Sequence, residues 1–222
     1  RKVSFKAFFS DMAQADAFRR CADSDMQKGT PGTLRVEGWF QRCFVVASEV
    51  DGIGGGFFAA KLTLVLLDGV WRRGTTTAFE PVQGSADYEF LDLPYDLPYD
   101  LGATSPQQYA VNPGYSGSPA KLVVYGPAVN PSVRLAGNLY QVDVTVPEGG
   151  YMDIDPLRRT VTVVAADGSA MDAFSKAHRG SGEGSGEYIF ERVPVGTSEI
   201  SWDNSFGFDL TLYEEEGEPA WS

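Results

Sequence analysis

The chain has 222 residues, and with 43% hydrophobic and 13% aromatic residues it is too apolar for an intrinsically disordered protein. Its formal net charge of −12 argues against nucleic acid or an anionic membrane as the main partner, because binding to phosphates depends on Lys and Arg. The sequence has no apolar run of about 18 residues and no signal-peptide pattern, so we expect neither membrane insertion nor secretion by the Sec route.

Residues 10–23 are predicted to form the one helix of the chain, with Ser10 or Asp11 as its cap. The apolar face at helical spacing consists of Ala13, Ala17, Phe18 and Cys21. The two cysteines of the chain, Cys21 and Cys43, are expected to be buried free thiols, since two cysteines in a chain of this length are no disulfide framework. A disulfide between them stays open as the alternative if the fold brings them together.

Two strand-like segments follow the helix. The segment 34–50 alternates between apolar and polar residues and predicts two strands or one long bent strand, with Phe40 facing inward and Gln41 facing outward. The glycine-rich residues 51–56 are interpreted as a flexible connection, and residues 57–71 as a mostly buried strand that ends at Trp71. The polar residues 72–89 show no clear periodicity and are interpreted as an extended arm.

Residues 90–102, FLDLPYDLPYDLG, repeat the unit Leu-Pro-Tyr-Asp. Pro94 and Pro98 exclude a regular helix, so the aspartates of the repeat do not line one helical face as metal ligands would. Tyr95 and Tyr99 instead place flat apolar rings beside a stiff backbone, which suits packing against another surface. We interpret the repeat as an adhesive connector rather than a metal site.

The second half of the chain has the sequence pattern of an antiparallel β-protein. Residues 105–120 are rich in Pro, Gly and Ser and are interpreted as a linker or the first loops of a new domain. Short strands are then predicted at 121–125, 132–136, 139–146, 158–164, 186–193, 198–202 and 206–213. This number of strands needs two sheets. The inward-facing side chains of the two clearest segments are Tyr140, Val142, Val144, Val146, Phe206, Phe208, Leu210 and Leu212.

No group of residues predicts catalysis, a metal site or a cofactor. His178 is the one histidine and is interpreted as a surface residue. Asp153 and Asp155 could share a strand face and hold calcium, but Asp155 followed by Pro156 is more typical of a β-turn. The glycine-rich stretches at 52–56 and 180–186 lack the following helix that phosphate cradles need.

Three stretches, taken in order, resemble the distal tail protein family, a tail and baseplate component of long-tailed phages with non-contractile tails. They are LDGVWRR at 67–73, the Leu-Pro-Tyr-Asp repeat, and residues 137–164 together with the closing FDLTLYEEEGEPAW. The resemblance implies a mainly β fold in which residues 1–104 form a tail-tube-like ring domain with one helix. Residues 105–222 would form a galectin-like antiparallel β-sandwich.

The resemblance also implies a function and partners. The protein would be a non-enzymatic virion protein, made in the cytoplasm of the bacterial host, that forms a hexameric adaptor ring at the tail tip. Its partners would be the tail tube protein, the baseplate hub or tail-associated protein, and receptor-binding proteins. Trp71, Pro94, Tyr95, Pro98 and Tyr99 would serve assembly or connection.

Two further expectations accompany the resemblance. Family members usually carry additional strands ahead of the helix, so we expect that Arg1 is not the natural start or that this member is shortened. The alternative function is a carbohydrate-binding β-sandwich that mediates attachment to the host surface. Its candidate glycan contacts are the aromatic residues Tyr151, Tyr188 and Trp202.

Overall fold

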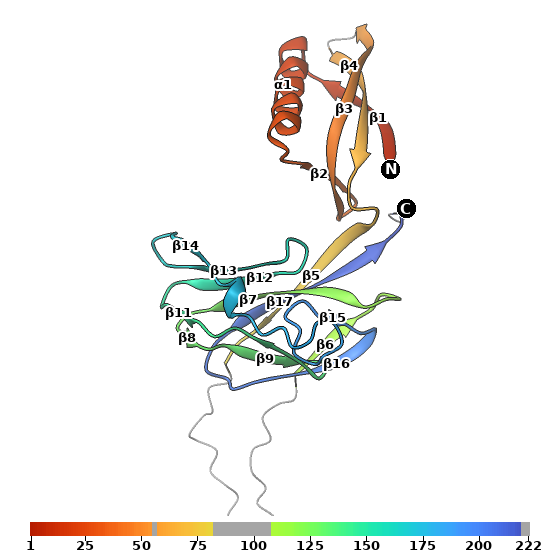
Figure 1. Cartoon of the computed structure of the whole chain (residues 1–222). Helices are drawn as coiled ribbons and strands as arrows, with labels where there is room; N and C mark the ends of the chain where they lie inside the picture. The colour runs from red at the N-terminus through yellow and green to blue at the C-terminus, as the bar shows by residue number, and fades with distance from the viewer. Residues whose placement is uncertain (55–56, 82–107, 219–222) are drawn as a thin grey trace, which may run out of the picture. The chain divides into compact units, whose positions relative to one another are not determined.

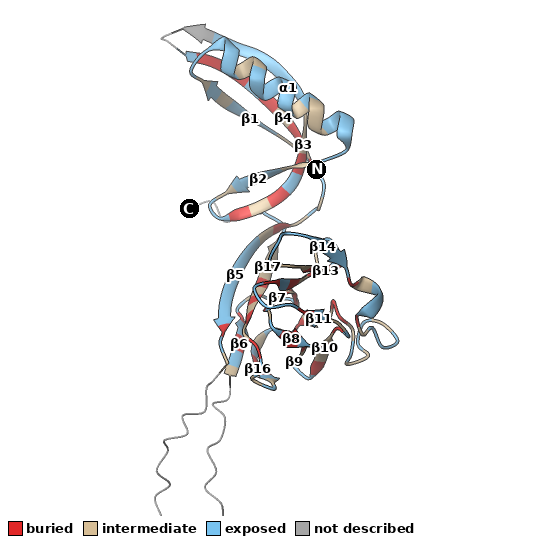
Figure 2. Cartoon of the chain, turned by 90° about the vertical axis from the view of Figure 1, so that its left-hand side faces the viewer, coloured by how far each residue is buried: buried red, intermediate tan, exposed pale blue. Residues whose placement is uncertain are grey.

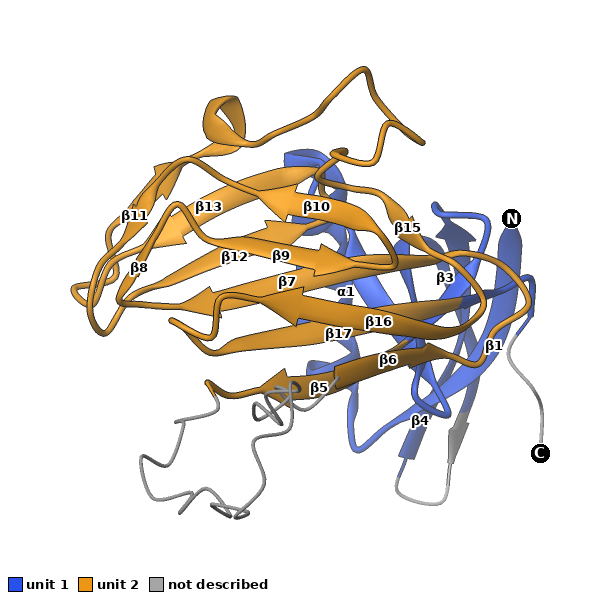
Figure 3. Ribbon diagram, turned by 90° about the horizontal axis from the view of Figure 1, so that it is seen from below, with its two compact units in different colours: residues 1–73, 215–222 blue, residues 74–214 orange. Residues whose placement is uncertain are grey.

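The computed structural model describes residues 1–54, 57–81 and 108–218, and the Leu-Pro-Tyr-Asp repeat lies outside these ranges. The chain divides into two compact units, which are coloured separately in Figure 3. Unit 1 contains residues 1–73 and 215–222, and unit 2 contains residues 74–214. The first boundary of this division lies between residues 73 and 74, and the chain returns to unit 1 at residue 215.

Unit 1 is a mainly antiparallel sheet with one helix (Figure 1). Its strand order is β1-β4-β3-β5, and β2 also pairs with β3. The element bounds are β1 Lys2–Phe9, α1 Met12–Lys28, β2 Gly32–Val36, β3 Trp39–Gly54, β4 Phe57–Leu66 and β5 Trp71–Phe79. A strand thus precedes the helix, which the sequence analysis did not predict, although Val3, Phe5 and Ala7 alternate with polar residues.

The helix is longer than predicted and has a different inner face. Asp11 caps it by accepting a hydrogen bond from the backbone nitrogen of Gln14 at 2.8 Å. It ends at Gly29, whose φ of 68° is the left-handed conformation typical of a C-cap. The partly buried apolar residues are Ala15 and Ala22, whereas the predicted face of Ala13, Ala17, Phe18 and Cys21 is exposed. Figure 2 shows that most of α1 is exposed.

The hairpin between β2 and β3 corrects the predicted orientation of two side chains. Its two-residue turn consists of Glu37 and Gly38, both with positive φ, as in type I′ hairpin turns. Because Val36 pairs with Trp39 across this turn, Gln41 lies on the buried side and Phe40 on the opposite side. Strand β3 then continues to Gly54, through residues that the sequence analysis interpreted as a flexible connection.

The core of unit 1 lies on the helix side of this sheet. Alternate residues of β4 supply its centre, and Val3, Ala7 and Phe9 of β1 pack against them. The buried residues are Trp39, Cys43, Phe58, Ala60, Leu62, Leu64, Leu66 and Trp71. Cys43 is therefore a buried free thiol as predicted, whereas Cys21 is free but exposed, contrary to the prediction.

Unit 2 is an antiparallel β-sandwich, as predicted (Figure 1). One sheet has the order β5-β17-β7-β12-β13-β14 with β15 paired to β7, the other has the order β10-β9-β16-β6, and β11 pairs with β8. The strands of unit 2 that follow β5 are β6 Gln108–Asn112, β7 Ser118–Tyr125, β8 Ala128–Val129, β9 Ser132–Leu135, β10 Asn138–Gln141, β11 Thr145–Val146, β12 Tyr151–Asp155, β13 Thr160–Val164, β14 Ala170–Asp172, β15 Arg192–Val193, β16 Gly196–Trp202 and β17 Phe208–Glu216. A short 3-10 helix, η1, spans Phe174–Lys176.

The two sheets of unit 2 enclose a continuous core. The predicted inward-facing residues of 140–146 and 206–212 contribute to it, with Val142 and Val146 fully buried and Val144 packed against the core. The ring of Phe208 stacks on that of Phe79 with centroids 4.9 Å apart. Strand β6 lies in the segment interpreted as a linker or the first loops of a new domain.

Strands β5 and β17 are neighbours in the sheet, and each has residues in both units. Within unit 2 the hydroxyls of Thr76 and Thr211 lie 2.8 Å apart. Gly74 is a position of close approach, since a Cβ there would lie 3.1 Å from side-chain atoms of both Thr211 and Tyr213. The chain therefore enters unit 2 beside the residues through which it leaves.

Candidate assembly surface and a cationic hollow

Unit 1 leaves many large apolar side chains in contact with solvent. We call these residues the apolar surface of unit 1; they are Phe5, Phe8, Met12, Phe18, Met26, Val46, Val50, Phe57 and Leu67. Single exposed apolar residues are normal on a folded protein, whereas exposed apolar side chains in contact with one another, as Phe8 and Phe57 are, are typical of an interaction surface. No residue of α1 is fully buried, so the helix gains little from packing within the unit.

The sheet face opposite the helix carries an aromatic pair beside an ion pair. Phe8 is 63% exposed and contacts the ring of Phe57 edge-on, with centroids 5.5 Å apart. Both lie opposite the core, because the neighbouring Phe9 and Phe58 pack on the helix side. Lys6 of β1 forms a 2.7 Å ion pair with Asp51 of β3.

The outer edge of this sheet is formed by β1, which pairs with β4 on one side. Among the described strands none pairs with its other side, so the backbone N–H and C=O groups there have no ladder partner. Such an edge is a template for pairing with another chain. Unit 1 thus offers a strand edge next to exposed aromatic residues.

A groove of about 210 Å³ separates the second half of α1 from the sheet. Phe5, Phe18 and Leu34 line it, together with both cysteines, Cys21 from the helix and Cys43 from β3. Burial raises the pKa of the Cys43 thiol above its ordinary value. The cysteines thus lie on the same groove as free thiols, and no disulfide joins them.

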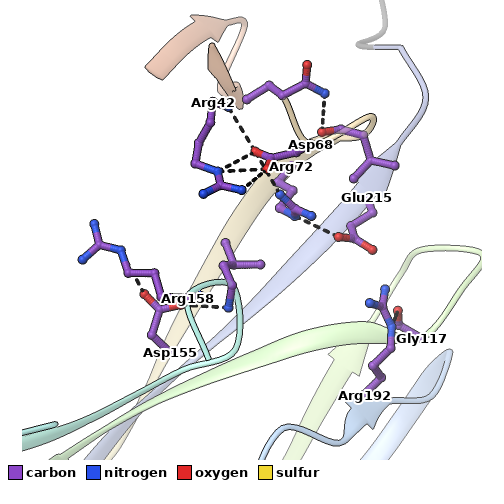
Figure 4. A network of polar contacts seen from close by, with 11 residues as sticks. Arg42, Asp68, Arg72, Gly117, Asp155, Arg158, Arg192 and Glu215 are labelled. Atoms are coloured by element: carbon purple, nitrogen blue, oxygen red, sulfur yellow. Dashed lines mark hydrogen bonds and ion pairs between the residues drawn. The ribbon is translucent and has the colours of Figure 1, made fainter. Parts of the chain in front are cut away.

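An ion-pair cluster joins four segments of unit 1 (Figure 4). Asp68, in the turn between β4 and β5, accepts hydrogen bonds from the backbone nitrogen of Arg42 at 3.1 Å and from its Nε at 2.9 Å. Arg72 lies 3.4 Å from Asp68 and donates from Nε to Glu215 at 2.8 Å. Burial alone would raise the pKa of Asp68, but the hydrogen bonds and charge of Arg42, with the charge of Arg72, hold it below its ordinary value.

Of the residues predicted to serve assembly or connection, the structure describes Trp71. Trp71 is 5% exposed and belongs to the core of unit 1, at the start of the strand that leads into unit 2. Pro94, Tyr95, Pro98 and Tyr99 lie outside the described residues.

The three aromatic residues predicted as glycan contacts do not form one site. Trp202 packs edge-on against Phe208, with ring centroids 5.1 Å apart, and donates from Nε1 to the carbonyl of Phe206 at 3.0 Å. Tyr151 is 39% exposed on strand β12. Tyr188 lines a hollow that sequence reasoning missed.

This cationic hollow of unit 2 has a volume of about 440 Å³. Its charged lining side chains are Arg159, from the turn between β12 and β13, and Arg179. The other side chains that line the hollow are the aromatic rings of Phe174, Tyr188 and Phe190 and the hydroxyl of Ser181. The sequence signal for it is weak, since Arg159 and Arg179 lie 20 positions apart in segments predicted as a strand and a loop.

The other polar candidates take structural positions. Asp155 opens a turn, as favoured from the sequence, because its Oδ1 accepts from the backbone nitrogens of Leu157 at 2.8 Å and Arg158 at 3.1 Å. Asp153 pairs with Lys121 at 3.1 Å. The described residues contain no group of three or more His, Cys, Asp or Glu side chains placed to hold a metal ion.

His178 is half-buried and contacts an acidic side chain. Its Nε2 lies 3.0 Å from Asp143 Oδ2, and its backbone nitrogen donates to the carbonyl of Gln141. The pKa of Asp143 is lowered by the hydrogen bond from Gln141 and by that from His178.

None of the described helices has the length and hydropathy needed to span a membrane.

Comparison with known proteins finds similarity at the level of structure. No protein-family model matches the chain, and no curated protein matches it. Among solved structures, a chain of the phage p2 baseplate in its activated conformation with calcium matches with a TM-score of 0.61 and 11% identity, over 99% of this chain and 80% of that one. The same baseplate with strontium gives a TM-score of 0.60 and 12% identity, with the same coverage.

A third solved structure is the SPP1 Dit protein, described as a paradigm of the hub adsorption apparatus in phages that infect Gram-positive bacteria. It matches with a TM-score of 0.49 and 8% identity, over 97% of this chain and 79% of that chain. The two p2 baseplate structures confirm, at the level of the fold, the resemblance to tail and baseplate components that the sequence indicates. Nearly the whole chain, both units included, has the fold of a phage p2 baseplate chain.

Proposed function

We propose that this chain is a non-enzymatic structural protein of a phage tail, which assembles with copies of itself into a ring at the tail tip. The observation that carries the proposal is the similarity to the phage p2 baseplate chain, which extends over 99% of this chain. A shared fold alone does not fix a function. The surface of unit 1 supplies the second support.

The features of unit 1 suit contacts between copies of the chain. A ring closes when each subunit presents one surface to the next and a different surface to the previous one. Unit 1 has two such surfaces, the free edge of β1 and the exposed side of α1 with Met12 and Met26. Burial of the apolar surface of unit 1 between subunits would remove its exposed aromatic rings from water.

We further propose that the ring has six subunits and connects the tail tube protein to a baseplate hub and to receptor-binding proteins. The excess of 30 acidic over 18 basic side chains suits a ring around a DNA passage, since such a protein does not grip the phosphates of its cargo. The tyrosines of the Leu-Pro-Tyr-Asp repeat stay our proposed adhesive connector. Alanine at both Tyr95 and Tyr99 should weaken assembly if the repeat packs on a neighbouring subunit.

Electron microscopy of negatively stained protein, combined with sedimentation velocity, tests the proposal. We expect rings with six-fold symmetry and a sedimentation coefficient far above that of a 24.1 kDa monomer. A folded protein that sediments as a monomer at about 10 μM, where even a modest oligomer of micromolar affinity is populated, would contradict self-assembly. Added tail tube protein should then bind the rings and not isolated monomers.

A further inference from the structure

We propose that the cationic hollow of unit 2 binds a saccharide that carries a phosphate or carboxylate group. The hollow lies within unit 2, so the proposal does not depend on ring assembly. Its charged lining residues are both arginines, in a chain whose formal net charge is −12. A concave site with aromatic walls and a few converging polar groups is the usual form of a small-molecule site.

The two guanidinium groups are available to a ligand. Neither Arg159 nor Arg179 forms an ion pair with an acidic side chain of the described chain, whereas the neighbouring Arg158 lies 3.8 Å from Asp155. The guanidinium of Arg179 lies over the ring of Phe174 at 5.1 Å from its centroid. This cation–π contact holds the guanidinium beside the ring, and the N–H groups of a guanidinium can bind an anion with two hydrogen bonds.

Arg159 has a left-handed backbone conformation as the last residue of the turn that joins Asp155 to Thr160. Its φ is 56°, in the left-handed region where glycine and asparagine are favoured and other side chains cost free energy. The turn itself is held by Asp155, which accepts from two backbone nitrogens, so a glycine at 159 would fit it better. An arginine at such a position is a reason to look for a function of the side chain.

The aromatic wall suits the apolar face of a sugar ring. Phe190 is 8% exposed and stacks with Phe174 at 6.0 Å between centroids, while Tyr188 meets Phe190 edge-on at 6.0 Å. The hydroxyls of Tyr188 and Ser181 have no hydrogen-bond partner within the described chain, so they can bind sugar hydroxyls. Phosphate or carboxylate alone would use the arginines but not this wall.

The wall is held in place from behind. The buried side chain of Asn138 accepts from the backbone nitrogen of Tyr188 at 3.2 Å and donates to its carbonyl at 3.0 Å. The glycine-rich segment beside it is fixed by Glu191, which accepts from the backbone nitrogen of Gly184 at 2.7 Å. Sites whose lining is fixed in this way lose less conformational entropy on binding.

Isothermal titration calorimetry of the full chain tests the proposal with four probes: glucosyl phosphate, glucuronate, neutral glucose and inorganic phosphate. We expect at least one acidic sugar to bind, and inorganic phosphate and glucose to bind about tenfold more weakly or not at all. Arg159→Gly and Arg179→Gln should each weaken binding about tenfold to hundredfold, since hydrogen bonds to charged groups are lost. Arg158→Gln removes the same charge one residue away and should leave the affinity within about twofold.

The melting temperature of each variant shows whether a loss of binding comes from the loss of the site or from unfolding of the chain. Arg159→Gly should melt at the same temperature as the natural chain or higher, because glycine relieves the left-handed strain. Three results would overturn the proposal: no heat with either acidic sugar up to about 10 mM, equal affinity in Arg159→Gly and the natural chain, or inorganic phosphate or glucose binding as tightly as the acidic sugars.

Discussion

Arg72 and Glu215 are separated by 143 positions in the sequence, yet the Nε of Arg72 lies 2.8 Å from a carboxylate oxygen of Glu215. Their side chains are 16% and 15% exposed, so this ion pair is sheltered from solvent. The pair connects β5 and β17 at the points where these strands belong to unit 1. Asp68 is the centre of the cluster, because it contacts both Arg42 and Arg72.

Asp68→Asn is expected to destabilise unit 1. The substitution keeps an acceptor but removes the negative charge that receives hydrogen bonds from Arg42 and faces Arg72, and the Asp68 side chain is 6% exposed. We expect a loss of about 2 kcal/mol in the free energy of unfolding, measured by urea denaturation. Asp16→Asn is the control, because its pair with Arg19 is exposed on both sides and should contribute little.

The contribution of Asp68 should depend on pH in a defined direction. The folded protein lowers the pKa of Asp68, so its stabilisation is complete above the unfolded value near pH 4 and is lost as the pH falls through the folded value. The difference in unfolding free energy between the natural chain and Asp68→Asn should be constant from about pH 7 to 5 and shrink below about pH 4. A difference that grows on acidification would contradict the ion-pair cluster.

Local patterns in the sequence predict Ser10 or Asp11 as the helix cap and several of the sandwich strands, because these depend on neighbouring residues. The strand predicted at 186–193 was wrong except at Arg192–Val193, and β12 was not predicted. The pairing of β5 with β17 could not be predicted in this way, since residues 72–78 are polar on both faces and find their partner more than 130 positions later. The inward position of Gln41 follows from the turn at Glu37, which changes which side chains share a face. Without the turn type, sequence periodicity places Gln41 and Phe40 on the wrong faces of the sheet.

The candidate sites were less predictable than the fold. Exposure of Phe8 and Phe57 cannot be read from a sequence in which aromatic residues usually indicate a core. The cationic hollow depends on bringing Arg159 and Arg179 together through β13 and η1. The sequence indicates Tyr188 as a glycan contact only through its aromatic ring, whereas its position beside Arg159 and Arg179 follows from the tertiary structure.

Phe8→Gln should weaken self-association without unfolding the chain. Phe8 is 63% exposed, so its removal costs the monomer little, whereas an aromatic anchor in an interface commonly contributes more than a tenfold change in affinity. Sedimentation velocity should show a shift toward smaller species. Tyr115→Gln is the matched control, because Tyr115 is 77% exposed in unit 2, and a similar shift in that variant would argue against the apolar surface of unit 1.

Trp202→Phe should reduce stability. The smaller ring gives up contact with Phe208, and the carbonyl of Phe206 loses its hydrogen bond from the indole nitrogen. We expect a loss of about 1–2 kcal/mol in the free energy of unfolding, measured by denaturation followed by circular dichroism. Tyr151→Phe, on the exposed side of β12, should change stability little; unchanged stability in Trp202→Phe would remove its assignment to the core.

The two cysteines should react at very different rates. Cys21 is exposed on α1, whereas Cys43 is buried and burial raises the pKa of its thiol, which lowers the thiolate fraction. With iodoacetamide at neutral pH, peptide mass spectrometry should find Cys21 modified at least about tenfold faster than Cys43. Equal rates in the folded chain would mean that α1 opens readily from the sheet.

The adjacency of Gly74 and Tyr213 has a consequence for how this protein can change over generations. In sequence terms, unit 2 is an insertion within unit 1, and its first and last residues lie on neighbouring strands. A gene segment that encodes residues 74–214 could be exchanged for another sandwich, or for a tight hairpin turn, without rerouting the chain of unit 1. Unit 2 can thus diversify in sequence while the strands and helix of unit 1 are kept.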